Sequence, residues 1–186
     1  MLAEDSDAAL AIANEVLPTF RGHYVEALTG GLRAKLGLTT EQEGDSELSQ
    51  AFLNALTDGQ ADFTLAFRRL GDAAADPAAD ATVRSLFENK PEAFDNWAVR
   101  WRQRLAADPM DGTARKAAMD AVNPVYIPRN HRVEAALTAA AEREDYAPFE
   151  ELLTVLAKPY EARPEFAAYE EPPPPDQRVY RTFCGT

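Results

Sequence analysis

Residues 91–106 read PEAFDNWAVRWRQRLA, and this stretch indicates the fold class more clearly than any other part of the chain. Phe94, Trp97 and Trp101 recur at three- and four-residue spacing, which places them along one face of an α-helix. Leu105 continues the same stripe, and proline at position 91 suits a first helical turn. Because this face carries the heaviest apolar side chains in the sequence, we expect it to be buried in a core.

The N-terminal part predicts a long helix from Asp7 onward. Its apolar stripe, again at three- and four-residue spacing, consists of Leu10, Ala13, Leu17, Phe20, Tyr24 and Leu28. Pro18 would kink or restart this helix. Gly30-Gly31 and Gly37 interrupt the pattern, so we expect the helix to end near them.

Shorter helical segments follow along the rest of the chain. Thr39-Thr40 with Glu43 predicts a capping box for the next helix, which closes at Asp58-Gly59. We expect a loop over residues 72–80, a cap at Thr113, and an irregular, proline-bound linker over residues 123–130. The predicted helical segments after the capping box carry Leu48 to Leu56, Phe63 to Leu70, Phe94 to Leu105, Ala117 to Val122, Asn130 to Glu142 and Tyr146 to Ala157.

The sequence therefore predicts an all-α fold, a bundle of about six or seven helices with an extended Pro-rich C-terminal tail. Six of the 13 prolines fall between Pro159 and Pro175. Such a composition favours an extended polyproline II conformation, and a segment of this kind either makes no contact with the folded domain or lies on another surface. We divide the chain into a helical domain, residues 1–157, and a tail, residues 158–186.

Composition and charge exclude several function classes. The 186 residues carry 19 Lys and Arg against 31 Asp and Glu, which argues against a nucleic-acid binder and against an anionic-membrane binder. No stretch approaches the length of a membrane-spanning helix, and the acidic N-terminus does not resemble a signal peptide. A single cysteine excludes an internal disulfide framework. We expect a soluble, cytoplasmic setting.

Charge is distributed unevenly along the chain. Residues 63–132 hold 11 basic and 9 acidic side chains, whereas residues 1–62 hold 3 and 11. The basic band is formed mostly by Arg68, Arg69, Arg100, Arg102 and Arg104. These arginines are interpreted as a solvated helix face, or as a surface facing an acidic partner or the acidic flanks.

Residue patterns for catalysis are largely absent. The nine glycines form neither of the phosphate-binding patterns GxGxxG and GxxxxGK[ST]. The sequence around Asp62 resembles a metal-binding motif only superficially. His23 and His131 lack a second ligand or nucleophile at useful spacing. Carboxylate pairs such as Glu150-Glu151 and Glu170-Glu171 are expected on solvated faces. We therefore assign no catalytic, cofactor-binding or metal-binding residue.

Cys184 is the remaining chemical candidate, and it is the third residue from the end of the sequence. A lone thiol in a tail is a poor packing residue. Spacing alone leaves two alternatives, a thiol that pairs with a cysteine elsewhere or a residue without a role.

Several ordered motifs resemble one known family, the selenoprotein O family. The matching segments are Arg33-Ala34-Lys35-Leu36-Gly37-Leu38, Asp62-Phe63-Thr64 with Phe67-Arg68-Arg69-Leu70, Phe94-Asp95-Asn96-Trp97, Asn123-Pro124-Val125-Tyr126-Ile127-Pro128-Arg129-Asn130, Lys158-Pro159-Tyr160, and a cysteine at position 184. In order, they are similar to the C-terminal region of that family, and the resemblance covers nearly the whole chain.

The resemblance implies a protein adenylyltransferase. Members have a kinase-like fold that binds ATP with magnesium and transfers AMP to Ser, Thr or Tyr hydroxyls of proteins. The family's nucleotide-binding and catalytic residues lie upstream of the matched region, so none is carried over, and this chain alone is predicted to be inactive. Its implied partners are an N-terminal kinase-like domain of the same protein and the protein substrates of the whole enzyme.

One residue is carried over from the resemblance, because Cys184 matches a terminal redox residue of the family. The usual Cys-Ser-Ser ending is Cys184-Gly185-Thr186 here. Our leading hypothesis is a helical portion of an adenylyltransferase with a redox tail. The alternative is a stand-alone, non-enzymatic helical interaction module. A domain that stands alone should be polar all round, whereas a part of a larger protein should expose an apolar patch.

Overall fold

The computed structural model describes residues 5–177, and that part of the chain is all-α, as the sequence predicts. Its α-helices are α1 (Ser6–Lys35), α2 (Asp45–Gly59), α3 (Phe63–Ala75), α4 (Asp80–Arg84), α5 (Pro91–Ala106), α6 (Gly112–Val122), α7 (Asn130–Arg143) and α8 (Ala147–Leu156). Short 3₁₀ helices cover Pro77–Ala79, Pro164–Tyr169 and Pro175–Gln177. No helix within residues 5–177 is both long and apolar enough to cross a membrane.

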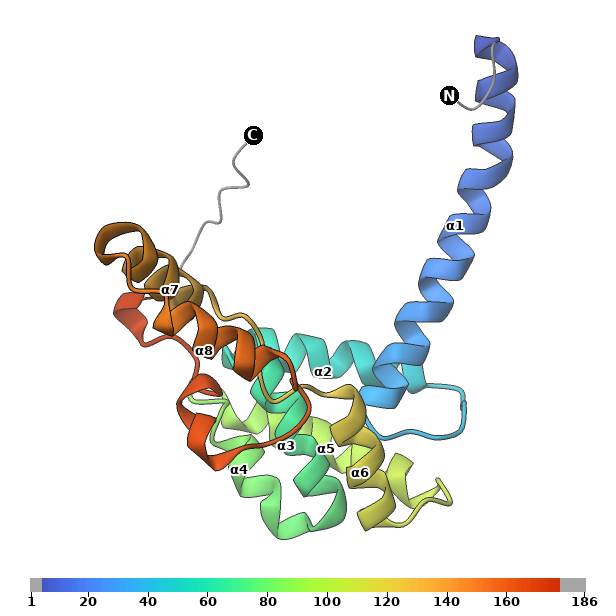
Figure 1. Cartoon of the computed structure of the whole chain (residues 1–186). Helices are drawn as coiled ribbons and strands as arrows, with labels where there is room; N and C mark the ends of the chain where they lie inside the picture. The colour runs from blue at the N-terminus through green and yellow to red at the C-terminus, as the bar shows by residue number, and fades with distance from the viewer. Residues whose placement is uncertain (1–4, 178–186) are drawn as a thin grey trace.

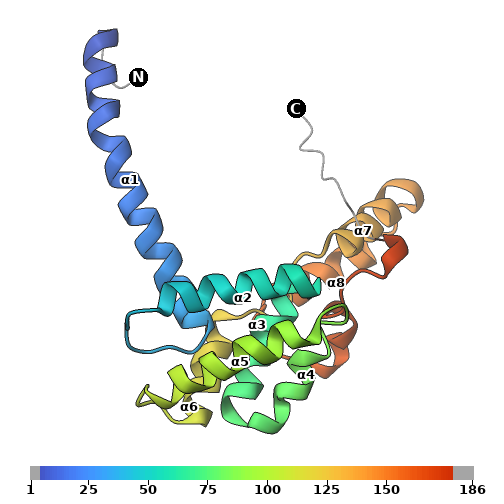
Figure 2. The ribbon, with the colours of Figure 1, turned by 180° about the vertical axis from the view of Figure 1, so that it is seen from behind.

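Helix α5 provides the centre of the core, which confirms the prediction from its apolar stripe. Trp101 is fully buried and Trp97 nearly so, and their rings stack with centroids 5.3 Å apart. Phe52 of α2 lies 4.2 Å from the Trp97 ring and contacts Phe67 of α3 edge-on. The helices that surround this aromatic cluster, α2 to α6, are called the body below. Figure 2 shows α2 and α5 running across it.

Both indole N–H groups in the core donate to backbone carbonyls. Trp97 Nε1 donates to the Leu48 carbonyl and Trp101 Nε1 to the Leu36 carbonyl, each at 2.9 Å. A buried indole without an acceptor would cost free energy, so these bonds fix where the two carbonyls lie. The second bond ties the end of α1 to the centre of the body.

The prediction of a loop over residues 72–80 is wrong for most of these residues. Helix α3 continues to Ala75, and α4 begins at Asp80 after one 3₁₀ turn. Gly71 lies inside α3, and a side chain there would approach Asp120 Oδ1 to 3.0 Å, so close packing rather than a helix end accounts for this glycine. Alanines 73 to 75 are good helix formers, and Ala73 is buried in the core.

Helix α1 is the long N-terminal helix that the sequence predicts. It passes through Pro18 and through Gly30-Gly31 without a break and ends at Lys35. Gly37 then takes a positive φ of 74°, a conformation that glycine adopts at little cost. Figure 1 shows α1 leaving the body and extending far beyond it.

Two predicted caps are wrong. Gly44, not a Thr39-Thr40 capping box, precedes α2, with a left-handed φ of 90°. Asp111 rather than Thr113 caps α6, and its side chain accepts from the N–H groups of Thr113 and Ala114 at 3.0 Å. Thr39 and Thr40 bind elsewhere, as described below.

The chain after residue 123 forms a second, smaller cluster. The irregular linker over residues 123–129 is confirmed, and α7 and α8 then pack against each other. Val125, Tyr126 and Val155 are buried there, with Phe166 and Tyr169 of the tail packed against them. Residues 164–169 form a 3₁₀ helix rather than extended chain, and this part of the tail lies on the α7–α8 pair.

Candidate functional site where the first helix leaves the body

A polar network, in which Asp45, Asp108 and Arg115 are buried, holds the segment between α1 and α2. It is called the latch below and consists of Thr39, Thr40, Asp45, Arg104, Asp108 and Arg115. Asp108 lies at its centre with a fully buried carboxylate. The carboxylate accepts hydrogen bonds from the Thr39 N–H at 2.8 Å and the Thr39 hydroxyl at 2.6 Å. The Thr40 N–H adds a third bond at 3.1 Å.

The arginines of the latch satisfy the charge of these carboxylates. Arg115 is 3% exposed, pairs with Asp108 at 3.3 Å and donates to the carbonyls of Gly37 and Met110. Arg104 Nε pairs with Asp45 Oδ1 at 2.6 Å. Since buried ions need both a partner and further hydrogen bonds, the latch fixes α5, α6 and the α1–α2 segment relative to one another.

The electrostatics of the latch follow from these bonds. Burial raises the pKa of the Asp108 carboxyl, but the hydrogen bonds from Thr39 and Thr40 lower it more, so that pKa lies well below its usual range. At Asp45, burial likewise raises the pKa, but the hydrogen bonds from Arg104 and the Gln42 N–H, together with the charge of Arg104, lower it more, so that the pKa lies below its usual value. Both groups are therefore carboxylates at neutral pH, with no proton to donate in general acid catalysis.

Helix α1 presents an apolar face that nothing in the described chain covers. Its large apolar side chains between residues 10 and 28 are 39% to 66% exposed, and α1 contains no buried residue. They are Leu10, Ile12, Val16, Leu17, Phe20, Tyr24, Val25 and Leu28, called the apolar arc below. Among the residues of α1, Leu32 is the one that packs against the core cluster, close to where the helix joins the body.

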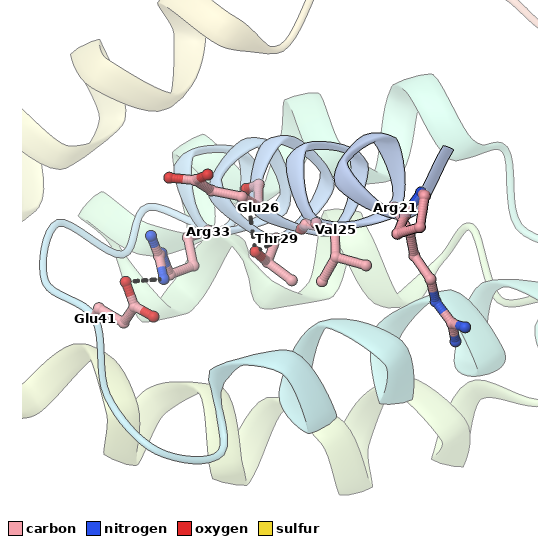
Figure 3. A pocket seen from close by; sticks show the side chains of 8 residues that line it. Arg21, Val25, Glu26, Thr29, Arg33 and Glu41 are labelled. Carbon is pink, nitrogen blue, oxygen red and sulfur yellow. Dashed lines mark hydrogen bonds and ion pairs between the residues drawn. The ribbon is translucent and has the colours of Figure 1, made fainter. Parts of the chain in front are cut away.

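A hollow of about 600 Å³ lies between α1 and the segment that follows it. Figure 3 shows Val25, Thr29 and Arg33 of α1 along one side and Glu41 across from them. Arg33 and Glu41 form an ion pair at 2.7 Å. The hollow is open and carries charges of both signs, so it offers no enclosed site for a small substrate.

The structure places four of the five arginines of the basic band in contacts within the chain. Arg68 donates to the carbonyls of Asp120 and Asn123, and Arg69 to the Thr82 carbonyl. Arg102 pairs with Asp80. Arg104 belongs to the latch. The acidic partners of Arg68, Arg102 and Arg104 therefore lie within the chain itself. Arg100 lies exposed on α5.

The other candidates from the sequence occupy structural positions. Asp62 caps α3 by accepting from the Leu65 N–H at 2.8 Å and pairs with Arg129 at 2.8 Å. His23 is exposed on α1. His131 is half-buried on α7, and burial lowers its pKa. Of the carboxylate pairs, Glu150-Glu151 is exposed, whereas burial raises the pKa of Glu170. Cys184 lies outside the described residues.

The part of the chain that the structure describes offers no ligand set for the metal ion that accompanies a nucleotide. Within residues 5–177, no group of three or more His, Cys, Asp or Glu side chains is placed to hold a metal ion. Sequence reasoning missed the latch, because Thr39 and Asp108 lie 69 residues apart and Asp108 showed only a helix-ending Asp-Pro pair. No local pattern could have joined Asp108 to Thr39.

Comparisons with known proteins give the context for this arrangement. The sequence profile of the family described as Protein adenylyltransferase SelO matches residues 3–157. A protein nucleotidyltransferase YdiU of Rhodopseudomonas palustris strain BisB5 is 56% identical over all 186 residues, and that of Bradyrhizobium diazoefficiens is 55% identical. The chain spans 38% of the length of each of these curated relatives.

Proposed function

The chain belongs to the Protein adenylyltransferase SelO family, and we propose that it is the C-terminal helical portion of a protein that transfers AMP from ATP to Ser, Thr or Tyr hydroxyls. In this proposal the chain supports a kinase-like catalytic domain formed by other parts of the longer protein. The observation that carries the proposal is the match along the whole chain to proteins named protein nucleotidyltransferases.

The proposal assigns ATP and magnesium to residues outside this chain. The described residues offer no cluster of metal ligands, and the buried carboxylates of the latch are occupied by arginine and threonine donors. Carboxylates committed to such bonds have little capacity left for a metal ion. The contribution of this chain is therefore structural, through the body and the helix that extends from it.

Proposed redox control rests on Cys184 and its match to the family's terminal cysteine. The described part of the tail is attached to the rest of the molecule by Arg129, which donates to the Glu170 carbonyl at 2.7 Å, and by Arg132, which donates to the Ala168 carbonyl at 2.6 Å. Oxidation would join Cys184 to a cysteine outside this chain, with loss of two protons and two electrons to a cellular oxidant such as a disulfide. Replacing Cys184 with Ser in the longer protein should remove the dependence of AMP transfer on thiol reductant. Unchanged dependence would argue against the redox role.

Transfer from ATP labelled at its α-phosphate tests the main proposal. The 186-residue chain with magnesium and a protein extract should give no labelled protein, whereas the full-length R. palustris relative should give labelled Ser, Thr or Tyr. Labelling by the 186-residue chain alone would contradict the assignment of catalysis to other residues. Failure of the full-length relative to transfer label would contradict AMP transfer itself.

A second candidate is a stand-alone helical interaction module. Its binding surface would be formed by Phe149 and Leu153 on α8 and by Tyr146 just before that helix, which are 40% to 57% exposed. The mass of the native polypeptide in its own cells separates the candidates. A stand-alone module should have the 20.4 kDa of this sequence, whereas a portion of an adenylyltransferase should be much heavier.

A further inference from the structure

We propose that the apolar arc of α1 is a docking surface, and that its occupant is the remaining polypeptide of the longer family members, which closes around the helix as a concave apolar groove. This inference rests on the proposed function, because it names the partner surface through which the chain supports the catalytic domain. It goes beyond that function by identifying the face of one helix as the contact.

The width of the arc decides what kind of partner can cover it. At about 100° per residue, the exposed apolar side chains from Ile12 round to Val25 spread over about 220° of the helix circumference. A seam between two helices of a coiled coil uses a narrower stripe, and a helix on a protein surface typically needs little more than about 100°. An arc this wide requires contacts from several sides, which one partner helix cannot supply.

The glycines of α1 support a close external contact. Glycine disfavours a helix interior, so it is usually retained where something approaches closely. A side chain built at Gly30 or Gly31 would meet nothing within 4 Å in this chain. No contact within the described residues therefore explains them, and by the same helical geometry Gly31 lies within the arc.

The latch presents this face in a fixed direction. In addition to the contacts that Asp108 and Arg115 make, the end of α1 is held by Lys35. Its Nζ donates to the Val122 carbonyl and to Asn123 Oδ1, each at 3.1 Å. Asn123 Nδ2 donates back to the Lys35 carbonyl at 3.0 Å. Because residues 36–177 hold α1 at its C-terminal end and bury no side chain along the rest of it, the helix projects from the body as Figure 1 shows.

The share of the relatives' length that lies outside this chain identifies the occupant. The chain aligns over its full 186 residues but makes up 38% of the R. palustris relative. The other 62% is large enough to form a domain with a groove. A second copy of this chain that paired through its own projecting α1 would give the narrow geometry of a helix pair and leave much of the arc exposed.

Thiol labelling tests the docking face in proteins as they exist. Single cysteines are introduced by Leu17→Cys in the arc and Ala11→Cys on the opposite side of α1, in a Cys184→Ser background, and at the aligned positions of the full-length R. palustris relative. Both positions should react rapidly with a maleimide in the 186-residue chain. In the relative, the cysteine aligned with Leu17 should react at least tenfold more slowly than in the 186-residue chain. The reaction of the cysteine aligned with Ala11 should slow much less.

Three results would overturn the inference. Unchanged reactivity at the Leu17 position of the relative would show that the arc stays exposed, and equal slowing at both positions would show that the face is wrong. A 186-residue chain that sediments as a dimer, and as a monomer after Leu17→Asp, would assign the arc to a second copy. AMP transfer by the labelled relatives is measured in parallel, so loss of the proposed activity and loss of the docking face are separate outcomes.

Discussion

The body and α1 use similar apolar side chains in opposite ways. In α5, Phe94 and Trp101 are at most 1% exposed. In α1, by contrast, Phe20 is 66% exposed and Leu17 is 64% exposed. Both helices show the same three- and four-residue spacing. Periodicity therefore identifies an apolar face but not the partner that covers it. For α5 the partner lies in this chain, and for α1 we place it in the rest of a longer protein.

The largest effect on stability should come from removing the centre of the body. Trp101→Ala deletes a fully buried ring that stacks on Trp97 and donates to the Leu36 carbonyl. Such truncations cost about 4 kcal/mol, so the free energy of unfolding in urea, followed by circular dichroism, should fall by about that amount. Trp101→Phe, which keeps most of the packing, should cost clearly less. Equal losses would show that the ring packing does not stabilise the body.

The next effect should come from the latch. Asp108→Ala leaves Arg115 buried without its carboxylate, which costs about 3 kcal/mol. Asp72→Ala is the matched control, because Asp72 is 53% exposed in its pair with Lys116 and should contribute less than about 1 kcal/mol. Thermal unfolding of the two variants would contradict the account if their midpoints fell equally.

Acid should weaken the latch in a defined direction. Because the pKa of Asp108 in the folded chain lies below the value of about 3.9 for an unfolded aspartate, its contribution to stability is present above about pH 4 and is lost as the pH falls toward the folded-state pKa. The free energy of unfolding should therefore drop less steeply between about pH 5 and about pH 2 in Asp108→Asn than in the original chain. Parallel curves would contradict this role.

The sequence could predict those elements that are determined by residues close together in the chain. The stripe of α5, the end of α2 at Gly59 and the irregular linker after Asn123 all follow from residues within one or two helical turns. The helix through Gly71 could not be predicted, because the reason for that glycine is its contact with α6, far along the chain. The latch was missed for the same reason, since threonine and aspartate pair there across tertiary structure.

A smaller effect is expected where the tail lies on the α7–α8 pair. The Tyr126 hydroxyl donates to the Arg163 carbonyl at 3.0 Å and accepts from the Arg163 N–H at 2.8 Å. Tyr126→Phe should cost about 1 kcal/mol and speed proteolysis of the tail after Lys158. Tyr160→Phe, at a residue 47% exposed, should leave the rate of cleavage unchanged. Equal rates in the two variants would show that these bonds do not hold the tail.

The smallest effect should come from α1 itself. Leu17→Asp places a charge on the exposed arc, where surface substitutions change stability by less than about 0.5 kcal/mol. Urea unfolding of the 186-residue chain should therefore give nearly the same midpoint as the original. A loss approaching that of Trp101→Ala would mean that the arc is packed within this chain.

Hydrogen exchange measured on α1 and α5 in two proteins tests the central claim most directly. In the 186-residue chain, the amides of residues 10–28 should exchange much faster than those of α5, because no residue between 36 and 177 buries a side chain of this part of α1. In the full-length R. palustris relative, the aligned amides of both helices should be protected to similar extents. Fast exchange of the α1 amides in the full-length relative would contradict the claim that the rest of the longer protein covers this helix.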